Sequence, residues 1–483
     1  MIFDLELRNI DWGTLYVASE WVVRIVALIL VPQRRPPSAA RAWLLLIFFL
    51  PWPGVLLYLL IGRAYMPRRR VEVQGQIYDL IRRIAPRALS GDALFEPAVS
   101  PELLPALRLA EQLSEFPLVG GNRFELLPVY DTAVDRIVAE VEGAQRYVHM
   151  LFYIFEDDAT GRKVADALER AVKRGVAVRV LMDAIGARDG LKAHAPALRA
   201  AGAEVVALLP FRLFKRERLR PDLRNHRKIV VIDGTVAFFG SQNIVSPTAN
   251  KGLTNEEMVV RAEGAVVRQL HAVLLGDRYL EIADLPPEVD AADVAVPAEH
   301  RPAYAQVLPS GPSYSTDTTE NVMVGLMYAA LSRVVLTTPY FVPSPQFVSA
   351  MCNAARRGVT VYLIVDRASN KPFVQLAQES YYDTLLEAGV HIHGYYGNFL
   401  HAKLMSVDEN VALIGSSNLD RRSFELNEEV SVLIYDPAVA ADLWKIEQGY
   451  LAKSDTVDPA VWAKRPASKR LLQNVARLFD ALM

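Results

Sequence analysis

The sequence predicts an α/β protein made of two duplicated α/β sandwich domains with pseudo-two-fold symmetry, preceded by an N-terminal helical membrane hairpin. Two observations lead to this fold class: apolar segments near the N-terminus and a repeat in the rest of the chain. The repeat is clearest where "NHRKIVVIDGTVAFFGSQN" from residue 225 returns as "LHAKLMSVDENVALIGSSN" from residue 400. His-x-Lys, an Asp five residues later and Gly-Ser-x-Asn after six more occur twice with one spacing, which indicates a duplicated unit.

Residues 1–65 are predicted to form the membrane hairpin. Its two apolar segments cover about 15–32 and 42–61, and each approaches the roughly 20 residues that a helix needs to cross a bilayer core. An acidic leading segment argues against a cleaved signal peptide. The aromatic residues expected to anchor the segment ends at the membrane interface are Trp12, Trp43 and Tyr65.

The form of this hairpin has alternatives. Glu20 and Arg24 lie one helical turn apart, so they either pair or mark a helix end near the headgroups. Pro51 and Pro53 permit a shallow, bent hairpin that does not cross the bilayer fully. Two buried core helices are the alternative to any membrane segment, and the apolar length favours the membrane.

Arginines around the second apolar segment predict the orientation. Because cytoplasmic flanks of membrane proteins are enriched in positive charge, the larger group should lie in the cytoplasm together with the main body. We therefore expect a multi-pass protein with a cytoplasmic body. The smaller group is Arg34, Arg35 and Arg41, and the larger group is Arg63, Arg68, Arg69 and Arg70.

The rest of the chain divides into a helical connection, 66–115, and two repeats, 116–300 and 301–483. Besides the paired motif, "KRGVAVRVLMD" at 173–183 matches "RRGVTVYLIVD" at 356–366. Each repeat reads strand, helix, strand, connection, strand, turn, strand, which is typical of a mixed sheet covered by helices. Packing about a pseudo-two-fold axis would bring equivalent residues of the two repeats together.

The geometry of a β-hairpin orders the side chains within each motif. Alternation along a strand puts His226 and Lys228 on one face. Asp233 lies five residues beyond the Lys, about 16 Å at strand rise, so it belongs to the far end and is interpreted as structural. A two-residue turn at the Asp-Gly pair sets Ser241 opposite His226, with Asn243 nearby. The same positions of the second copy are His401, Lys403, Asp408, Ser416 and Asn418.

These residue types together suit chemistry at phosphorus. A Lys ammonium binds phosphate oxygens, and Ser, Asn and loop N–H groups add donors. A His with a pKa near neutrality is a nucleophile, an acid or a base. With two sets facing each other, one His attacks phosphorus while the other protonates the departing oxygen, and the roles then reverse for an incoming hydroxyl. This scheme needs no metal ion.

Each imidazole also needs an acceptor that orients it. An acidic pair follows each Gly-Ser-x-Asn, in "NEEMVV" and in "NEEVSV". We expect Glu257 and Glu429 to be the orienting residues because they lead directly into the following apolar runs. Their neighbours Glu256 and Glu428 are expected to face solvent.

Composition limits the other possibilities. The chain has 483 residues, 52% of them hydrophobic, which is enough for two or three domains with full cores. Its formal charge of −2 provides no general attraction to nucleic acid, so we expect no nucleic-acid partner. One cysteine, Cys352, excludes an internal disulfide framework. His391 and His393 lack a third ligand at suitable spacing, so we expect strand residues and no metal site.

Two further segments have a membrane interpretation and an ordinary one. The basic and aromatic run "PFRLFKRERLRPDLRNHRK" either binds anionic headgroups or is a solvated charge run. The C-terminal helix either lies on the bilayer or packs on the body, and packing is the expectation. Its apolar face holds Leu471, Leu472, Val475, Leu478, Phe479 and Leu482.

The doubled motif resembles the signature of the phospholipase D superfamily, and the whole chain resembles its bacterial cardiolipin synthases. The likeness includes "FYIFEDD", "LRNHRKIVVID", "TTPYFVPS" and "NLDRRSFELNEEV", and it implies two phospholipase D-like domains. The first "NEE", which contains Glu257, differs from the sequence that is usual in the family at this place. The residues that match the catalytic motif of the family are His226, Lys228, Asp233, His401, Lys403 and Asp408.

The resemblance implies that a phosphatidyl group passes from one phosphatidylglycerol to another through a phosphohistidine, giving cardiolipin and glycerol. Family precedent makes His226 the nucleophile and His401 the acid and base. A hydrolase that releases phosphatidic acid, a nuclease or phosphodiesterase of the same fold, and a scaffold with degenerate sites are the alternatives. The implied partners are an anionic phospholipid and the bilayer of the bacterial inner (plasma) membrane, with no cofactor. The oligomeric state stays open.

Overall fold

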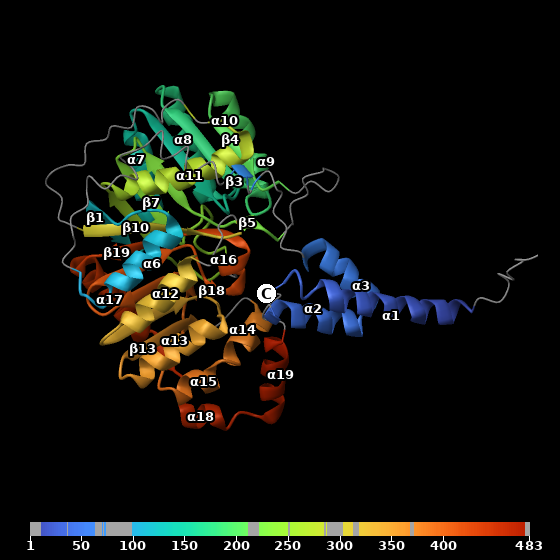
Figure 1. Ribbon diagram of the computed structural model, residues 1–483. Coiled ribbons are helices and arrows are strands. Elements are labelled where there is room, and N and C mark those ends of the chain that lie inside the picture. The colour runs from blue at the N-terminus through green and yellow to red at the C-terminus, as the bar shows by residue number, and fades with distance from the viewer. Residues whose placement is uncertain are drawn as a thin grey trace, which may run out of the picture. The chain divides into compact units, whose positions relative to one another are not determined.

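The protein forms two compact units, one with the N-terminal helices and one with both repeats (Figure 1). In Figure 1 the first repeat runs from cyan to yellow-green and the second from yellow-orange to red. The computed structural model describes residues 11–35, 37–62, 70, 72–73, 99–210, 222–249, 252–284, 286, 303–312, 318–367 and 371–478.

The first apolar segment is helix α1 (Trp12–Leu30). Asp11 caps its N-terminus by accepting a hydrogen bond from the Gly13 N–H at 3.1 Å. Among the described helices α1 alone is long and apolar enough to cross a membrane, and 6% of its apolar window is buried. The alternative of a buried core helix is therefore wrong for this segment. Arg24 pairs with Glu20 at 3.3 Å, one of the two arrangements expected.

The second apolar segment is not one helix. It consists of α2 (Pro37–Phe49), α3 (Pro51–Leu57) and a π-helical turn, η2 (Tyr58–Gly62). The break falls at Leu50, because the ring of Pro51 removes a backbone donor and disfavours helix in the residue before it. Each piece is shorter than a bilayer core requires. Of the two predicted spans, only α1 is long and apolar enough among the described helices to cross a membrane, and the bent alternative fits the second segment.

The aromatic residues that were expected to anchor the segment ends at the membrane interface differ in their exposure. Trp12 is exposed, whereas Trp43 is only 2% exposed and packs edge-on against Tyr58 with ring centroids 5.3 Å apart. Trp43 is therefore a packing residue of the hairpin and not an interfacial anchor. Tyr65 lies outside the described residues.

One mixed sheet runs through both repeats. The strands of the first repeat are β1 (Val119–Leu127), β2 (Tyr147–Phe152), β3 (Ala177–Asp183), β4 (Glu204–Leu208), β6 (Ile229–Ile232), β7 (Val236–Gly240) and β9 (Val259–Glu263). Those of the second are β10 (Ala303–Ser310), β11 (Arg333–Thr338), β13 (Thr360–Asp366), β14 (His391–Tyr395), β16 (Leu404–Val407), β17 (Val411–Gly415), β19 (Asn427–Tyr435) and β20 (Ser454–Thr456).

The strand order shows the duplication. It is β4-β3-β2-β6-β7-β9-β1 in the first repeat and β14-β13-β11-β16-β17-β19-β10 in the second, with β20 added at the outer edge. In each repeat three parallel strands are followed by antiparallel ones. The repeats join where β1 pairs antiparallel with β10. This arrangement confirms the predicted duplicated α/β sandwich.

Helices cover both faces of the sheet. Alternate residues of β6 separate the faces: Ile229 and Val231 belong to a core that includes α11, and Val230 and Ile232 to a core that includes α7 and α8. The first core also takes residues from α17, β10 and β19, so it is continuous across the repeats. These helices and their counterparts are α7 (Tyr130–Gly143), α8 (Ala159–Lys173), α11 (Val266–Ile282), α12 (Thr318–Ala329), α13 (Pro345–Arg356) and α17 (Pro437–Ala452).

The remaining helices are short or peripheral. They are α6 (Leu104–Ser114), α9 (Arg188–Ala193), α10 (Ala195–Ala201), α14 (Pro372–Glu379), α15 (Tyr382–Glu387), α16 (Arg421–Glu425), α18 (Pro459–Ala463) and α19 (Ala467–Arg477). The C-terminal helix packs on the body, as expected, but not through its apolar face: Gln473 Nε2 donates to Glu379 of α14 at 2.7 Å. Helix α19 buries Gln473 and Ala476, whereas Leu471 and Leu472 are 65% and 56% exposed. Phe479, Leu482 and most of the predicted basic loop lie outside the described residues.

Candidate active site

Two short parallel strand pairs bring the motifs of the two repeats together. Strand β5 (Arg224–Asn225) pairs with the start of β19, and the His226 N–H then donates to the Glu428 carbonyl at 2.8 Å. Strand β8 (Asn255–Glu256) pairs with β15 (Phe399–Leu400), and the His401 N–H donates to the Glu256 carbonyl at 2.8 Å. Each histidine is therefore held by the backbone of the other repeat.

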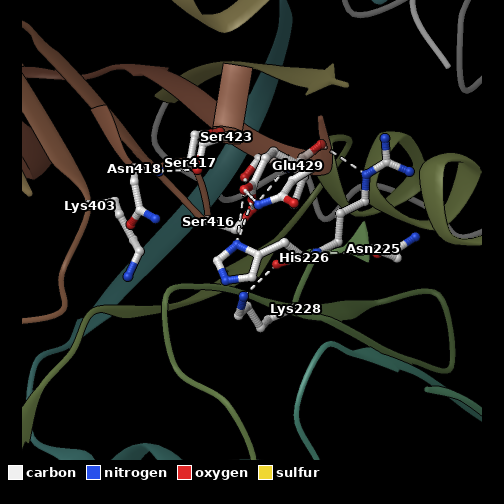
Figure 2. A network of polar contacts seen from close by, with 12 residues as sticks. Asn225, His226, Lys228, Lys403, Ser416, Ser417, Asn418, Ser423 and Glu429 are labelled. Atoms are coloured by element: carbon white, nitrogen blue, oxygen red, sulfur yellow. Dashed lines mark hydrogen bonds and ion pairs between the residues drawn. The ribbon is translucent and has the colours of Figure 1, made fainter. Parts of the chain in front are cut away.

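The carboxylates continue this exchange. Nδ1 of His226 lies 3.0 Å from both carboxylate oxygens of Glu429, which also accepts from Ser416 Oγ at 2.5 Å (Figure 2). Nδ1 of His401 lies 2.8 Å from Glu257, which accepts from Ser241 Oγ at 2.5 Å. The two glutamates are the ones the sequence favours, and each orients the imidazole of the opposite repeat.

Each serine hydrogen-bonds the glutamate of its own repeat. Ser241 therefore supports His401 through Glu257, whereas the sequence predicted that it would lie opposite His226. Ile232 pairs with Val236, so the connection has three residues and not two, and the predicted register moves by one position. Asp233 takes a positive φ of 52° in this connection, a conformation that Asp tolerates in tight turns.

Burial sets the protonation of each pair. It lowers the pKa of His226 to about 4, against the opposing charge of Glu429, and it lowers the pKa of His401 as well. Burial alone would raise the pKa of Glu257, but the charge and hydrogen bond of His401 outweigh it and hold the pKa at about 2. Each pair is thus a neutral imidazole with an ionised carboxylate. The carboxylate fixes the proton on Nδ1 and leaves the lone pair of Nε2 for chemistry.

The two lysines lie beside the imidazoles. Lys228 Nζ donates to the carbonyl of His226, and Lys403 Nζ donates to the carbonyl of His401. Both side chains are buried, and burial lowers the pKa of Lys228 to about 7 and that of Lys403 to about 8. Each lysine also lowers the pKa of the histidine of the other repeat, so the four groups act within one electrostatic site.

The asparagines shape the loops around the site. Asn243 Oδ1 accepts from the Ile154 N–H at 3.2 Å, which ties the loop to the end of β2. The Asn418 N–H donates to Ser423 Oγ at 3.2 Å, and Figure 2 shows Asn418 beside Lys403. Among the polar side-chain atoms of the described residues, Asn418 Oδ1 is buried without a hydrogen-bond partner.

The motif aspartates lie at the other end of the hairpins. Asp233 accepts from the N–H groups of residues 145, 146 and 147 at 2.7–2.9 Å. Asp408 accepts from those of residues 331, 332 and 333 at 2.7–3.0 Å. Burial would raise the pKa of Asp408, but these backbone hydrogen bonds lower it. Both carboxylates fasten the turn to the start of the neighbouring strand, as the hairpin argument expects.

The chain matches known families over nearly its whole length. The family model described as "Cardiolipin synthase, PLD-like domain" covers residues 137–275 and 323–448. The model described as "Phospholipase_D-nuclease N-terminal" covers residues 22–63. "Cardiolipin synthase A" of Yersinia pseudotuberculosis serotype O:3 (strain YPIII) is 34% identical, over 98% of this chain and 99% of the relative. The chain belongs to the cardiolipin synthases of the phospholipase D superfamily.

Other relatives agree with this family. The "Cardiolipin synthase A" of Yersinia pestis has the same identity and coverage. Among solved structures, phosphatidylserine synthase from Haemophilus influenzae Rd KW20 aligns with a TM-score of 0.61 at 15% identity, over 78% of this chain and 98% of that one. At this identity the likeness concerns the fold alone.

Sequence reasoning missed several residues behind the site of this cardiolipin synthase. Glu428 is 3% exposed and pairs with Arg227 at 3.1 Å, so the expectation that it faces solvent is wrong. Glu256 is partly buried and accepts from Tyr395 Oη and Asn398 Nδ2. A buried carboxylate needs a hydrogen-bond or ionic partner. The partners of Glu428 and Glu256 lie far away along the chain, so residue spacing in the sequence does not reveal them.

Two strand-end aspartates position the histidine loops of the synthase. Asp183 accepts from the Asn225 N–H at 3.0 Å, and Asp366 accepts from the Leu400 N–H at 2.9 Å. Each acceptor therefore holds the residue that precedes a motif histidine. The sequence could have indicated both aspartates, because the matched segments "VLMD" and "LIVD" each end in an Asp. In the described residues no cluster of three or more His, Cys, Asp or Glu is arranged for a metal ion.

Proposed function

We propose that this protein transfers a phosphatidyl group from one phosphatidylglycerol to the free glycerol hydroxyl of another, producing cardiolipin and glycerol. The observation that carries the proposal is the reciprocal pair of His–Glu–Ser arrangements, each built from both repeats. Two imidazoles whose Nδ1 atoms are engaged by carboxylates suit a reaction with one neutral nucleophile and one proton carrier, which takes up a proton on Nε2 before the first step. The family relationship supplies the substrate class.

In the first step Nε2 of His226 attacks the phosphorus of the donor lipid. The bond from phosphorus to the glycerol oxygen breaks. His401 takes up a proton on Nε2 before this step, stabilised by Glu257, and gives that proton to the departing glycerol oxygen, which leaves His401 neutral. Glu429 stabilises the positive charge that develops on the attacking imidazole. We assign Lys228, Lys403 and Asn418 as the donors to the phosphoryl oxygens, because the lysines lie beside the two imidazoles and Asn418 lies beside Lys403 (Figure 2). We assign the nucleophile to His226 because it is the more enclosed imidazole: its side chain is 11% exposed, against 16% for His401.

In the second step neutral His401 removes the proton from the acceptor hydroxyl. The new phosphorus–oxygen bond forms while the phosphorus–Nε2 bond breaks, which regenerates neutral His226. One helix long enough to span the membrane, α1, keeps the enzyme at the surface where both substrates reside. We propose a cytoplasmic body and an association of the bent α2–α3 segment with the same membrane.

Product analysis with defined lipids tests the proposal. Full-length protein in vesicles of phosphatidylglycerol should yield cardiolipin and glycerol in equal amounts by mass spectrometry. Phosphatidic acid as the main product would instead assign the protein as a hydrolase. An acid-stable lipid adduct is not expected, because phosphohistidine hydrolyses in acid, so the intermediate should be sought on the His226 peptide at alkaline pH. An adduct on the His401 peptide would reverse the two roles.

A further inference from the structure

The direction from which the second lipid arrives follows from the chemistry. In an in-line displacement the leaving group departs opposite the nucleophile, and the acceptor later enters by the same side. With His226 as nucleophile, that side belongs to His401 and the second repeat. An acceptor phosphatidylglycerol carries its own phosphate, three carbons from the attacking hydroxyl. A cation about one headgroup away from His401 would therefore distinguish this acceptor from water.

The second repeat builds a cationic wall next to its motif. Strand β18 (Leu419–Asp420) directly follows Asn418 and pairs with β12 (Phe341–Val342). Thr338 Oγ1 donates to the Tyr340 carbonyl at 2.8 Å and accepts from the Leu419 N–H at 3.2 Å, so it joins the two segments. Lys371 Nζ lies 4.3 Å from the centroid of the Tyr340 ring. The lysine is thus anchored on the wall that continues from the second motif.

A second cation lies on the same wall. Arg422 belongs to α16, whose N-terminus is capped where Asp420 accepts from the Ser423 N–H at 2.7 Å. Ser423 in turn binds the Asn418 N–H, so the position of Arg422 is tied to the motif loop. Asp420 lies within electrostatic range of both Lys371 and Arg422. Lys371 remains exposed, although the surrounding protein lowers the pKa of its ammonium and Arg422 adds to that effect.

The two repeats differ at this place. The positions that match Asp420, Arg421 and Arg422, counted from the motif asparagine, are Val245, Ser246 and Pro247 in the first repeat. The charged segment Asp420-Arg421-Arg422 therefore occurs only in the second repeat, on the side from which the acceptor enters. Arg188 follows Asp183 at the same interval as Lys371 follows Asp366, which provides a matched control in the first repeat.

We propose that Lys371 and Arg422 bind the phosphate of the acceptor phospholipid. The inference rests on the proposed function, since a hydrolase would need no such site. Holding the acceptor by its phosphate raises the local concentration of its hydroxyl over that of water. The donor phosphate is bound between the histidines and does not require these two side chains. The site therefore sets the choice of acceptor and not the rate of the first step.

The test compares two acceptors for one donor. Full-length protein in phosphatidylglycerol vesicles is given labelled glycerol, and both the cardiolipin formed and the label exchanged into phosphatidylglycerol are measured. Exchange uses a neutral acceptor, so it reports the donor site, the chemistry and correct folding. Lys371→Met should lower the ratio of cardiolipin to exchange about tenfold, because it removes a charged hydrogen bond to the acceptor phosphate. Arg422→Gln should act in the same direction.

Controls separate the possible outcomes. Lys371→Arg should retain the wild-type ratio because it keeps the charge, and Arg188→Met should leave the ratio unchanged. Equal losses of exchange and cardiolipin synthesis in Lys371→Met, or an unchanged ratio, would overturn the acceptor site. A wild-type protein that makes phosphatidic acid and no cardiolipin would overturn the proposed function itself. The products of the wild-type protein are therefore measured before those of any variant.

Discussion

The two repeats present the same chemical groups but support them differently. Behind His226 lies a buried ionic network in which Arg224 pairs with Asp183 at 3.1 Å and Arg227 pairs with Glu428 at 3.1 Å and with Asp277. Arg227 is among the largest fully buried side chains of the protein. The first imidazole therefore rests on charges that are matched inside the core.

Behind His401 the carboxylate that corresponds to Glu428 is Glu256, and its partners are the neutral groups of Tyr395 and Asn398. The positions that match Arg224 and Arg227 are Phe399 and Ala402, and the Phe399 ring stacks on the His401 imidazole with centroids 5.7 Å apart. On the first side the ring of Tyr153 meets His226 edge-on at 4.9 Å. The comparison shows that duplication preserved the groups expected to meet at phosphorus, while the layer behind them diverged. This divergence gives two similar imidazoles different surroundings for different steps.

The largest effect should come from removing either imidazole. His226→Ala and His401→Ala should each lower cardiolipin formation by about four orders of magnitude or more, because nucleophile and acid act as a unit. Mass spectrometry of the products measures the loss, and circular dichroism shows whether the variants fold. Near-normal turnover by either variant would contradict the shared site.

Next in size is the loss of the ionic support that only the first repeat has. Arg227→Met leaves Asp277 and Glu428 buried without their cation, so the free energy of unfolding should fall by about 3–5 kcal/mol. Thermal unfolding of the full-length protein in detergent measures this change. Ala402→Ser, at the matched position of the second repeat, should cost far less. Similar losses in the two variants would remove the distinction between the supports.

The crossed carboxylates should have an intermediate effect. Glu429→Gln and Glu257→Gln keep the shape but not the charge that fixes the tautomer, so turnover should fall about 10²- to 10⁴-fold. The double variant should lose less than the product of the two single effects, since both residues serve one reaction. Steady-state rates of cardiolipin formation measure these changes, and multiplicative losses would argue for independent sites.

The aspartates of the two hairpins should behave alike. Asp233→Asn and Asp408→Asn weaken the hydrogen bonds to the backbone, and each should cost about 1–3 kcal/mol of unfolding free energy. The turnover of the folded fraction should change less than tenfold. A loss as large as that of a histidine variant, at unchanged melting temperature, would assign these carboxylates a direct part in catalysis.

The smallest effect concerns pH. The pKa values of Lys228 and Lys403, about 7 and about 8, mean that rising pH removes positive charge from the free enzyme. The value of kcat/KM should therefore fall as pH increases through this range, whereas kcat should fall at higher pH because a bound phosphodiester stabilises the ammonium groups. Paired profiles of both constants measure this, and a kcat/KM that stays level well above pH 8 would contradict the assignment.

Much of this protein could be predicted from its sequence. The doubled spacing indicated the duplication, alternation put His226 and Lys228 together, and five residues of strand separated Asp233 from both. The acidic pairs pointed to Glu257 and Glu429. These predictions depend on local geometry, since a strand or a turn constrains residues that are close along the chain.

Tertiary structure decided the rest. The exchange that sets Glu429 on His226 and Glu257 on His401 joins residues 203 and 144 positions apart, and no local pattern encodes which of two equivalent carboxylates reaches which imidazole. The packing of Trp43 inside the hairpin and the exposed apolar face of α19 are of the same kind, because an amphipathic pattern shows that a face exists and not what covers it. Contacts between distant segments depend on how the two repeats pack, and that is a property of the whole chain.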